Sequence, residues 1–108
     1  MEKEKGMVVF MNDPVDRGGI VLSSAGHDKG KHFFVVGAEE NGYLLLADGK
    51  FRPIEKPKKK KTKHCRLCAR CGSEKIAEKL AVGAKIENAE LRKALNMFLS
   101  EEGTDHGK

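Results

Sequence analysis

The sequence predicts a small, mainly β domain that is followed by a basic linker and an α-helical C-terminal segment. Short apolar runs separated by turn residues occupy the first half of the chain, and helical spacing of apolar residues appears only near its end. At 108 residues, the chain has room for one compact domain with appendages and not for two independent cores.

Residues 1–17 are predicted to form a flexible leader. They begin with alternating Glu and Lys, continue through an apolar stretch at residues 7–11 and reach a turn signal at residues 12–14. The apolar stretch can add an edge strand, but the proline and the glycine pair that follow it favour a loosely packed tail equally well. Both alternatives stay open at this point.

Residues 18–57 are predicted to form a small antiparallel barrel. Strand-like runs lie at residues 20–22, 33–36, 43–47 and 51–54. Asn41-Gly42 is a pair favoured in tight hairpins, and Asp48-Gly49 marks the next reversal. Because so short a segment cannot build two packed sheets, curling into an SH3-like barrel is the economical way to protect the strand edges.

A charged loop, Gly26-His27-Asp28-Lys29-Gly30-Lys31, lies between the first two predicted strands. Gly26 and Gly30 can adopt backbone angles closed to other residues, and Asp28 is expected to order the turn. Lys29 and Lys31 carry positive charge to the tip. The combination predicts a loop that contacts phosphates, with His27 and His32 as turn and surface residues rather than ligands.

Residues 58–72 are predicted to form a basic, cysteine-containing arm. Its lysines repel one another too strongly to pack, so we expect the run at residues 56–63 to be disordered in the free protein and to bind phosphates. The alternative is that this lysine run is a linker that only increases solubility. Binding to an anionic lipid surface is less favoured, because no basic amphipathic helix or lipidation signal accompanies the run.

The arm contains a Cys-x-x-Cys-x-x-Cys sequence formed by Cys65, Cys68 and Cys71. Thiolates at this spacing can bind zinc or line part of an iron–sulfur site. A fourth ligand is the difficulty, because His64 adjoins the first cysteine and His106 lies in the tail. We therefore expect free thiols and no cofactor, with a zinc or redox module as an alternative.

Residues 73–108 are predicted to be helical, with a frayed polar tail from residue 100 onward. Ser73 is expected to cap a first helix that runs through Leu80 and stops at Gly83. Asn88 is expected to cap a second helix, which we expect to pack on the barrel or on the first helix. The apolar stripe of this second helix consists of Leu91, Leu95, Phe98 and Leu99.

Positive charge is concentrated in the middle of the chain. Residues 18–72 contain twelve basic and five acidic residues, whereas the segments on either side each have a net charge of −1. This asymmetry is typical of proteins that neutralise phosphates, and it predicts a nucleic-acid partner. The sequence contains no nucleophile elbow, no P-loop and no pair of carboxylates on a common apolar scaffold, so we do not expect an enzyme. Without a long apolar run or a secretory signal, a cytoplasmic location away from membranes is expected.

The loop at residues 26–31 resembles the KOW motif, with Gly30 as its fixed glycine. The segments Gly-Ile-Val-Leu (19–22), Ala-Gly-His-Asp-Lys-Gly-Lys (25–31), Ala-Asp-Gly-Lys (47–50) and Arg-Pro-Ile-Glu-Lys-Pro-Lys (52–58) extend the resemblance to the bacterial KOW-domain RNA-binding proteins. These are similar to the fourteenth eukaryote-type large-subunit ribosomal protein family. The resemblance covers residues 18–64 and implies a barrel that binds ribosomal or other structured RNA.

We therefore expect a non-catalytic RNA-binding protein with ribosomal RNA, and with it ribosomal proteins, as partners. A lysine-lined loop would read the shape of duplex RNA, which exposes phosphates and 2′-hydroxyls. The alternative is a KOW module that contacts RNA polymerase or a translation factor, as related modules in elongation factors do. The expected RNA-binding residues are Lys29, Lys31, Lys50, Arg52, Lys56, Lys58, Lys59, Lys60, Lys61 and Lys63.

Overall fold

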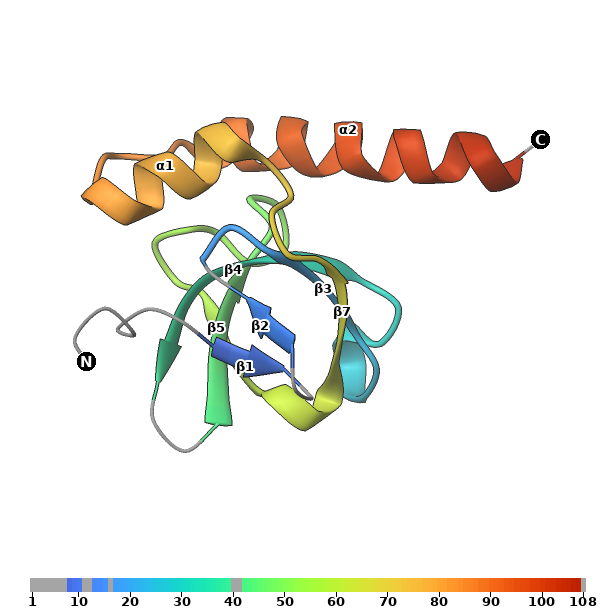
Figure 1. Cartoon of the computed structure of the whole chain (residues 1–108), viewed down its shortest axis with the longest axis horizontal. Helices are drawn as coiled ribbons and strands as arrows, with labels where there is room; N and C mark the ends of the chain where they lie inside the picture. Colours follow the sequence, from blue (N-terminus) through green and yellow to red (C-terminus); the bar gives the residue numbers. More distant parts are fainter. Residues whose placement is uncertain (1–7, 11–12, 16, 40–41, 108) are drawn as a thin grey trace.

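The structure is a computed structural model that describes residues 8–10, 13–15, 17–39 and 42–107. The described strands are β1 (Val8–Phe10), β2 (Asp13–Val15), β3 (Ile20–Ser23), β4 (His32–Glu39), β5 (Tyr43–Ala47), β6 (Lys58–Lys61) and β7 (Cys65–Ala69). They are followed by helices α1 (Glu74–Val82) and α2 (Asn88–Gly107). Figure 1 shows both helices on one side of the sheet, with α2 extending past it.

Five strands form one antiparallel sheet in the order β6-β5-β4-β3-β7. The hydrogen-bonded sheet is open, with β6 and β7 as its edges. These two edge strands are nevertheless joined by a single three-residue 3-10 turn, Thr62–His64. The sheet must therefore curl enough to bring the end of β6 and the start of β7 within reach of this turn. The Ser24 amide donates to the His64 carbonyl oxygen at 2.9 Å, next to the pairing of β3 with β7.

A separate two-stranded ribbon precedes this sheet. β1 pairs with β2 in antiparallel register, with Val8 opposite Val15. Part of the predicted leader therefore forms strands, but they pair with each other and not with the edge of the main sheet. The rest of the predicted leader, apart from Arg17, lies outside the described residues. It consists of residues 1–7, 11–12 and 16.

Two apolar clusters lie on opposite faces of the curled sheet. The cross-strand pair Val21 and Phe33 belongs to the inner cluster, and the adjacent pair Ile20 and Phe34 belongs to the outer one. Successive side chains of a strand point to opposite faces, so both pairs are fully buried only because both faces are covered. This accounts for the uninterrupted apolar run in β4.

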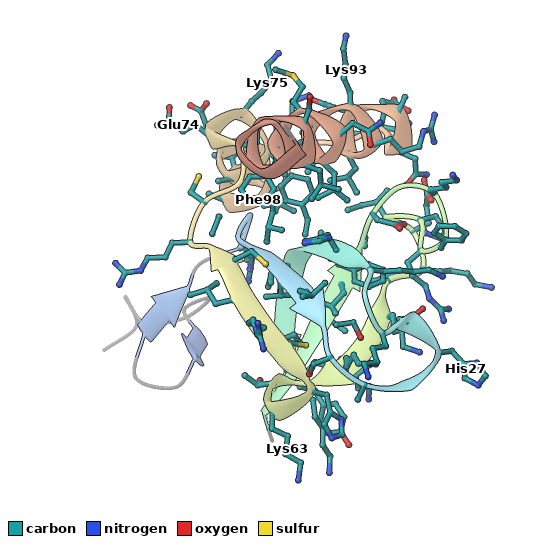
Figure 2. The ribbon with its side chains drawn as sticks, turned by 90° about the vertical axis from the view of Figure 1, so that its right-hand side faces the viewer. His27, Lys63, Glu74, Lys75, Lys93 and Phe98 are labelled. Atoms are coloured by element: carbon teal, nitrogen blue, oxygen red, sulfur yellow. The ribbon has the colours of Figure 1, made fainter. Side chains whose placement is uncertain are left out.

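The helices cover the outer face of the sheet, as the apolar stripe of α2 predicts. Leu91 and Leu95 are buried in the outer cluster, and Phe98 and Leu99 pack against it. Figure 2 shows Phe98 pointing from α2 toward the sheet. Ile76 of α1 is buried in the same cluster.

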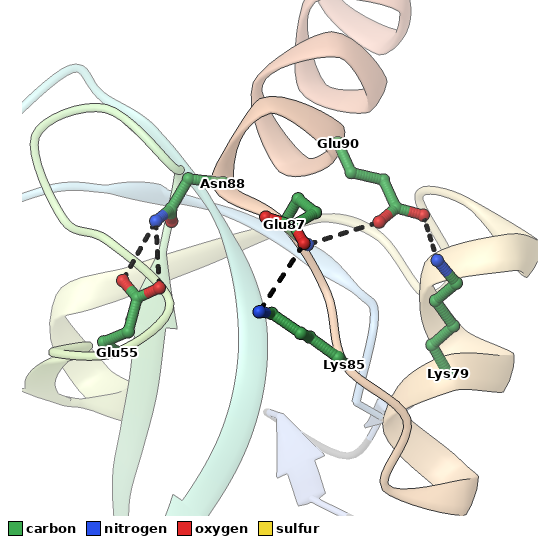
Figure 3. Close-up of polar contacts among 6 residues, drawn as sticks. All are labelled: Glu55, Lys79, Lys85, Glu87, Asn88 and Glu90. Carbon is green, nitrogen blue, oxygen red and sulfur yellow. Dashed lines mark hydrogen bonds and ion pairs between the residues drawn. The ribbon is translucent and has the colours of Figure 1, made fainter.

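The start of α1 is confirmed, and the start of α2 is not. The Ser73 hydroxyl accepts a hydrogen bond from the Ile76 amide at 3.3 Å, and α1 ends at Val82 with Gly83, the predicted stop, as its C-cap. In α2 the Glu87 carbonyl accepts the first intrahelical bond, so Asn88 is not the cap. The Glu87 amide donates to Glu90 Oε1 at 3.3 Å (Figure 3).

The side chain of Asn88 binds a loop and does not cap the helix. Its Oδ1 accepts a hydrogen bond from the Ile54 amide at 2.7 Å, and its Nδ2 donates to Glu55 at 2.9 Å (Figure 3). Lys79 Nζ of α1 donates to Glu90 Oε2 of α2 at 2.6 Å, a contact that Figure 3 also draws. These contacts fix α2 to the loop after residue 52 and to α1.

The predicted strand at residues 51–54 is wrong, because these residues form bends and a turn. Asp48 Oδ1 accepts hydrogen bonds from the amides of Lys50, at 2.9 Å, and Arg52, at 2.8 Å. This side chain therefore supplies the partners that a neighbouring strand would otherwise provide.

The predicted disordered arm is also wrong, because Lys58–Lys61 is the edge strand β6, paired with β5. Strand geometry sends alternate lysines to opposite faces, which separates charges that are adjacent in sequence. Lysines are also common on edge strands, where they discourage pairing with other chains. The second half of the predicted arm contains β7, so the sheet extends well beyond residue 57.

The C-terminal tail differs from its prediction as well. Helix α2 continues through Gly107, where the sequence predicts fraying from residue 100 onward. Once the packed first turns have formed, each added residue gains a hydrogen bond at little further cost. Within the part of the chain that the structure describes, neither helix has the length and apolar character needed to cross a membrane.

Truncating Leu91 to Ala should lower the free energy of unfolding by about 2–5 kcal/mol, because it removes a fully buried side chain from the outer cluster. Met97 lies on the same helix but is 59% exposed, so Met97→Ala should change the free energy of unfolding by less than about 0.5 kcal/mol. Urea denaturation of both variants measures the difference. Equal effects of the two substitutions would show that α2 is not docked.

Candidate nucleic-acid interface

Loop A (residues 26–31) is held in one conformation by backbone hydrogen bonds. Gly30 and Lys31 donate from their amides to the carbonyl oxygens of Ser23 and Asp28, both at 2.9 Å. Gly26 and Gly30 have φ angles of +80° and +90°, so the predicted need for glycine is confirmed. Lys29, between them, is exposed.

Asp28 points into the molecule and ties loop A to two other segments. Its residue is only 4% exposed, and Oδ2 forms ion pairs with Lys58 Nζ at 3.1 Å and with an Arg52 nitrogen at 3.7 Å. Oδ2 is a buried oxygen, and these two cations are its charged neighbours. Asp28 therefore does more than order its own turn.

These cations control the ionisation of Asp28. Burial alone would raise the pKa of the carboxyl group, but the close approach of Lys58 and the charges of Lys58, Arg52 and Lys60 outweigh it. The pKa of Asp28 therefore lies below its ordinary value of 3.8, and the group is ionised at neutral pH.

The predicted RNA-binding cations divide into a group that makes contacts within the protein and an exposed group. Lys60 is 8% exposed and donates to the Ala25 carbonyl oxygen at 2.8 Å. Together with Lys58 and Arg52, it is committed to holding the loops in place. Lys31 is half-buried, and the exposed predicted residues are Lys29, Lys50, Lys56, Lys59, Lys61 and Lys63.

Two of the exposed lysines lie on the outer side of β6 beside an aromatic ring. The ammonium groups of Lys59 and Lys61 are 5.5 and 5.8 Å from the centre of the Tyr43 ring. Lys59 also pairs with Glu39 at 3.3 Å in an exposed contact. The outer side of β6 therefore presents partly compensated positive charge next to an aromatic face.

Loop B (residues 48–52) lies beside loop A and presents Phe51, which sequence reasoning missed. The Phe51 residue is 55% exposed, and the ammonium groups of Lys31 and Lys50 lie 4.1 and 5.1 Å from its ring centre. The two lysines come from different loops and meet at one ring. The available signal in the sequence was a large apolar residue inside a turn, between Gly49 and Pro53.

Helix α2 closes the other side of this region. Arg92 donates to the Gly49 carbonyl oxygen at 2.8 Å, and a groove of about 650 Å³ lies between α2 and the two loops. Gly49 has a φ of +79°, and a Cβ there would collide with the carbonyl oxygen of Asn88. Arg92 and Asn96, which line the groove, were also missed, because the prediction considered only the apolar face of this helix.

The cysteines of the predicted arm do not converge on one point. Cys65 faces inward from β7 and is buried, whereas Cys68, three positions along, is exposed, as strand alternation requires. Cys71 is exposed beyond the strand. Among the described side chains, no three His, Cys, Asp or Glu residues are grouped as a metal site needs.

No protein-family model matches the sequence, and no curated protein matches it either.

Replacing Asp28 by Asn should lower the free energy of unfolding by about 1–3 kcal/mol at pH 7, because Lys58 and Arg52 lose their buried partner. The lowered pKa gives the pH dependence. The contribution of the Asp28 ion pairs to the free energy of unfolding is fully present above the unfolded-state pKa of Asp28. It is lost as the pH falls through the folded-state pKa of this group, which lies below 3.8. Urea denaturation at several pH values should therefore show the variant and the wild type converging in acid.

The matched control is Glu39→Gln, which breaks the exposed ion pair with Lys59. It should change the free energy of unfolding by no more than about 1 kcal/mol. A deficit in Asp28→Asn that persists unchanged far below pH 3.8 would mean that the lost charge is not its cause.

Cys65 should react with iodoacetamide much more slowly than Cys71 in the folded protein. Burial raises the pKa of the Cys65 thiol to about 11, despite the opposing charge of Lys60, and the thiolate is the reactive form. Peptide mapping after brief alkylation measures the two rates. In denaturant the two cysteines should react alike, and equal rates in the folded protein would contradict the burial of Cys65.

Proposed function

We propose that this chain is a non-catalytic, cytoplasmic RNA-binding protein whose curled sheet is an SH3-like barrel of the KOW type. Its target would be a structured RNA, with ribosomal RNA as the leading candidate. The barrel assignment is supported by the three-residue connection between the two edge strands and by the resemblance centred on Gly30. The target class is supported by that resemblance and by the positive charge of residues 18–72.

The observation that carries the proposal is the convergence of loops A and B. Lys31 and Lys50 are far apart in sequence, yet both ammonium groups lie within about 5 Å of the Phe51 ring. Lysine side chains bind phosphates as mobile point charges, and an exposed aromatic ring offers a surface on which bases stack. Nucleic acid supplies both partners in one ligand.

The buried ion pairs of Asp28 favour the same surface. They fix the positions of loop A, loop B and β6 relative to each other, so the exposed lysines of these segments need little ordering when they bind. Such preorganisation reduces the entropic cost of association. β6 would add Lys59 and Lys61 to the contact, in place of the disordered arm expected from the sequence.

The salt dependence of RNA binding tests this proposal. Replacing Lys29 and Lys50 by Gln should weaken binding to a structured ribosomal RNA fragment and should reduce the slope of log K against log salt by about 0.7 to 0.9 for each lysine. Filter binding or fluorescence anisotropy between about 50 and 200 mM salt measures the slope.

The control is the double variant Lys75→Gln and Lys85→Gln, which removes the same charge from α1 and from the segment that follows it. Both of these lysines are exposed, and Lys75 lies far from His27 of loop A in Figure 2. The control should bind as the wild type does. Equal slopes for both double variants would contradict the proposed surface, and salt-insensitive capture of RNA polymerase or a translation factor would favour the protein-interaction alternative.

A further inference from the structure

The groove between loops A and B and helix α2 has the size and composition of a ligand site. Its volume of about 650 Å³ falls within the usual range for small-molecule pockets. Its lining combines an aromatic ring, three cationic side chains, a histidine, an aspartate, a carboxamide and leucine side chains. Phosphate contact alone would need only the cations, so the remaining groups call for a ligand with an apolar, planar part.

Phe51 supplies the planar surface. Phenylalanine side chains are usually stabilised by burial, but Phe51 is 55% exposed. Its ring contacts the ammonium groups of Lys31 and Lys50. A base that stacked on the ring would take the place of an ammonium group over it. The long lysine stems allow the displaced charge to move to a neighbouring phosphate.

Helix α2 supplies the opposite wall. Arg92 is anchored by its hydrogen bond to the Gly49 carbonyl oxygen, at 2.8 Å. Asn96 follows four residues later, so both side chains lie on the same face of the helix. A carboxamide both donates and accepts hydrogen bonds, as the edge of a nucleobase does. The buried Leu95 lies beneath them.

We propose that this groove receives one unpaired nucleotide of the bound RNA, with its base stacked on Phe51 and its flanking phosphates held by Lys31 and Lys50. The inference rests on the proposed RNA-binding function and adds the class of target, namely structured RNA that carries a bulged or looped-out base. The bases of a continuous duplex are already stacked on one another, whereas unpaired bases offer a free face to aromatic side chains.

Three RNA hairpins of the same stem test the inference: one with a single bulged adenosine, one with an abasic bulge, and one fully paired. The bulged and abasic hairpins have the same backbone charge. The wild type should bind the bulged adenosine about tenfold more tightly than the abasic bulge at equal salt, as expected for one base stacked on an aromatic ring. Phe51→Ala should abolish this preference and leave the salt slope unchanged.

Further variants separate stacking from simple apolar contact. Phe51→Trp keeps a ring and should keep the preference, whereas Phe51→Leu keeps apolar volume without a ring and should lose it. Val82→Ala removes an even more exposed apolar side chain, 73% against 55% for Phe51, from α1 and should bind all three hairpins as the wild type does. Because Phe51 is exposed, the thermal unfolding temperatures of its variants should match that of the wild type.

The possible outcomes separate this inference from the proposed function. Equal affinity of the wild type for the adenosine and abasic bulges, with salt-dependent binding retained, would overturn the nucleotide site and leave the RNA-binding proposal standing. A preference that survives in Phe51→Ala would also overturn the site. Absence of salt-dependent binding to any of the hairpins or to a ribosomal RNA fragment would overturn both.

Discussion

The ion pairs of Asp28 fix the arrangement of the charged surface. One carboxylate, 4% exposed, lies 3.1 Å from Lys58 and 3.7 Å from Arg52, and so joins loop A, loop B and β6. Separating these segments would leave buried charge without a partner, which is costly. The exposed lysines beside them, including those around Phe51, owe their positions to cations that are themselves paired with Asp28.

Much of the fold could be predicted from the sequence, because the spacing of apolar residues reflects burial. β3, β4 and β5 follow from short apolar runs between turns, and the stripe of α2 follows from its helical spacing. β6 could not be predicted in this way, because Lys58–Lys61 has no apolar residue. What makes it a strand is non-local: β5 offers backbone partners along its length, and Asp28, far away in sequence, neutralises the inward charge.

Only part of the candidate site could be predicted from the sequence. Lysines in turns indicate a phosphate-binding surface, and the structure leaves most of them exposed. Phe51 and Arg92 gave no such signal, since a single phenylalanine in a turn and a single arginine on a helix are both common. They gain significance only from tertiary packing, which brings α2 against loop B at Gly49 and leaves the ring at the edge of a groove.

The outer apolar cluster, shared between the sheet and the two helices, limits how this module can be divided. A fragment ending at Gly72 would uncover Ile20, Phe34 and Ala47 as one contiguous patch, and such patches promote self-association. A fragment ending at residue 57 would also lack β6 and β7, and with them Lys58, one of the two ion-pair partners of Asp28, and Leu67, the β7 partner of Val21. The lysine-bearing loops therefore cannot be transferred to another protein alone. A chimeric protein that includes them must also include the helices.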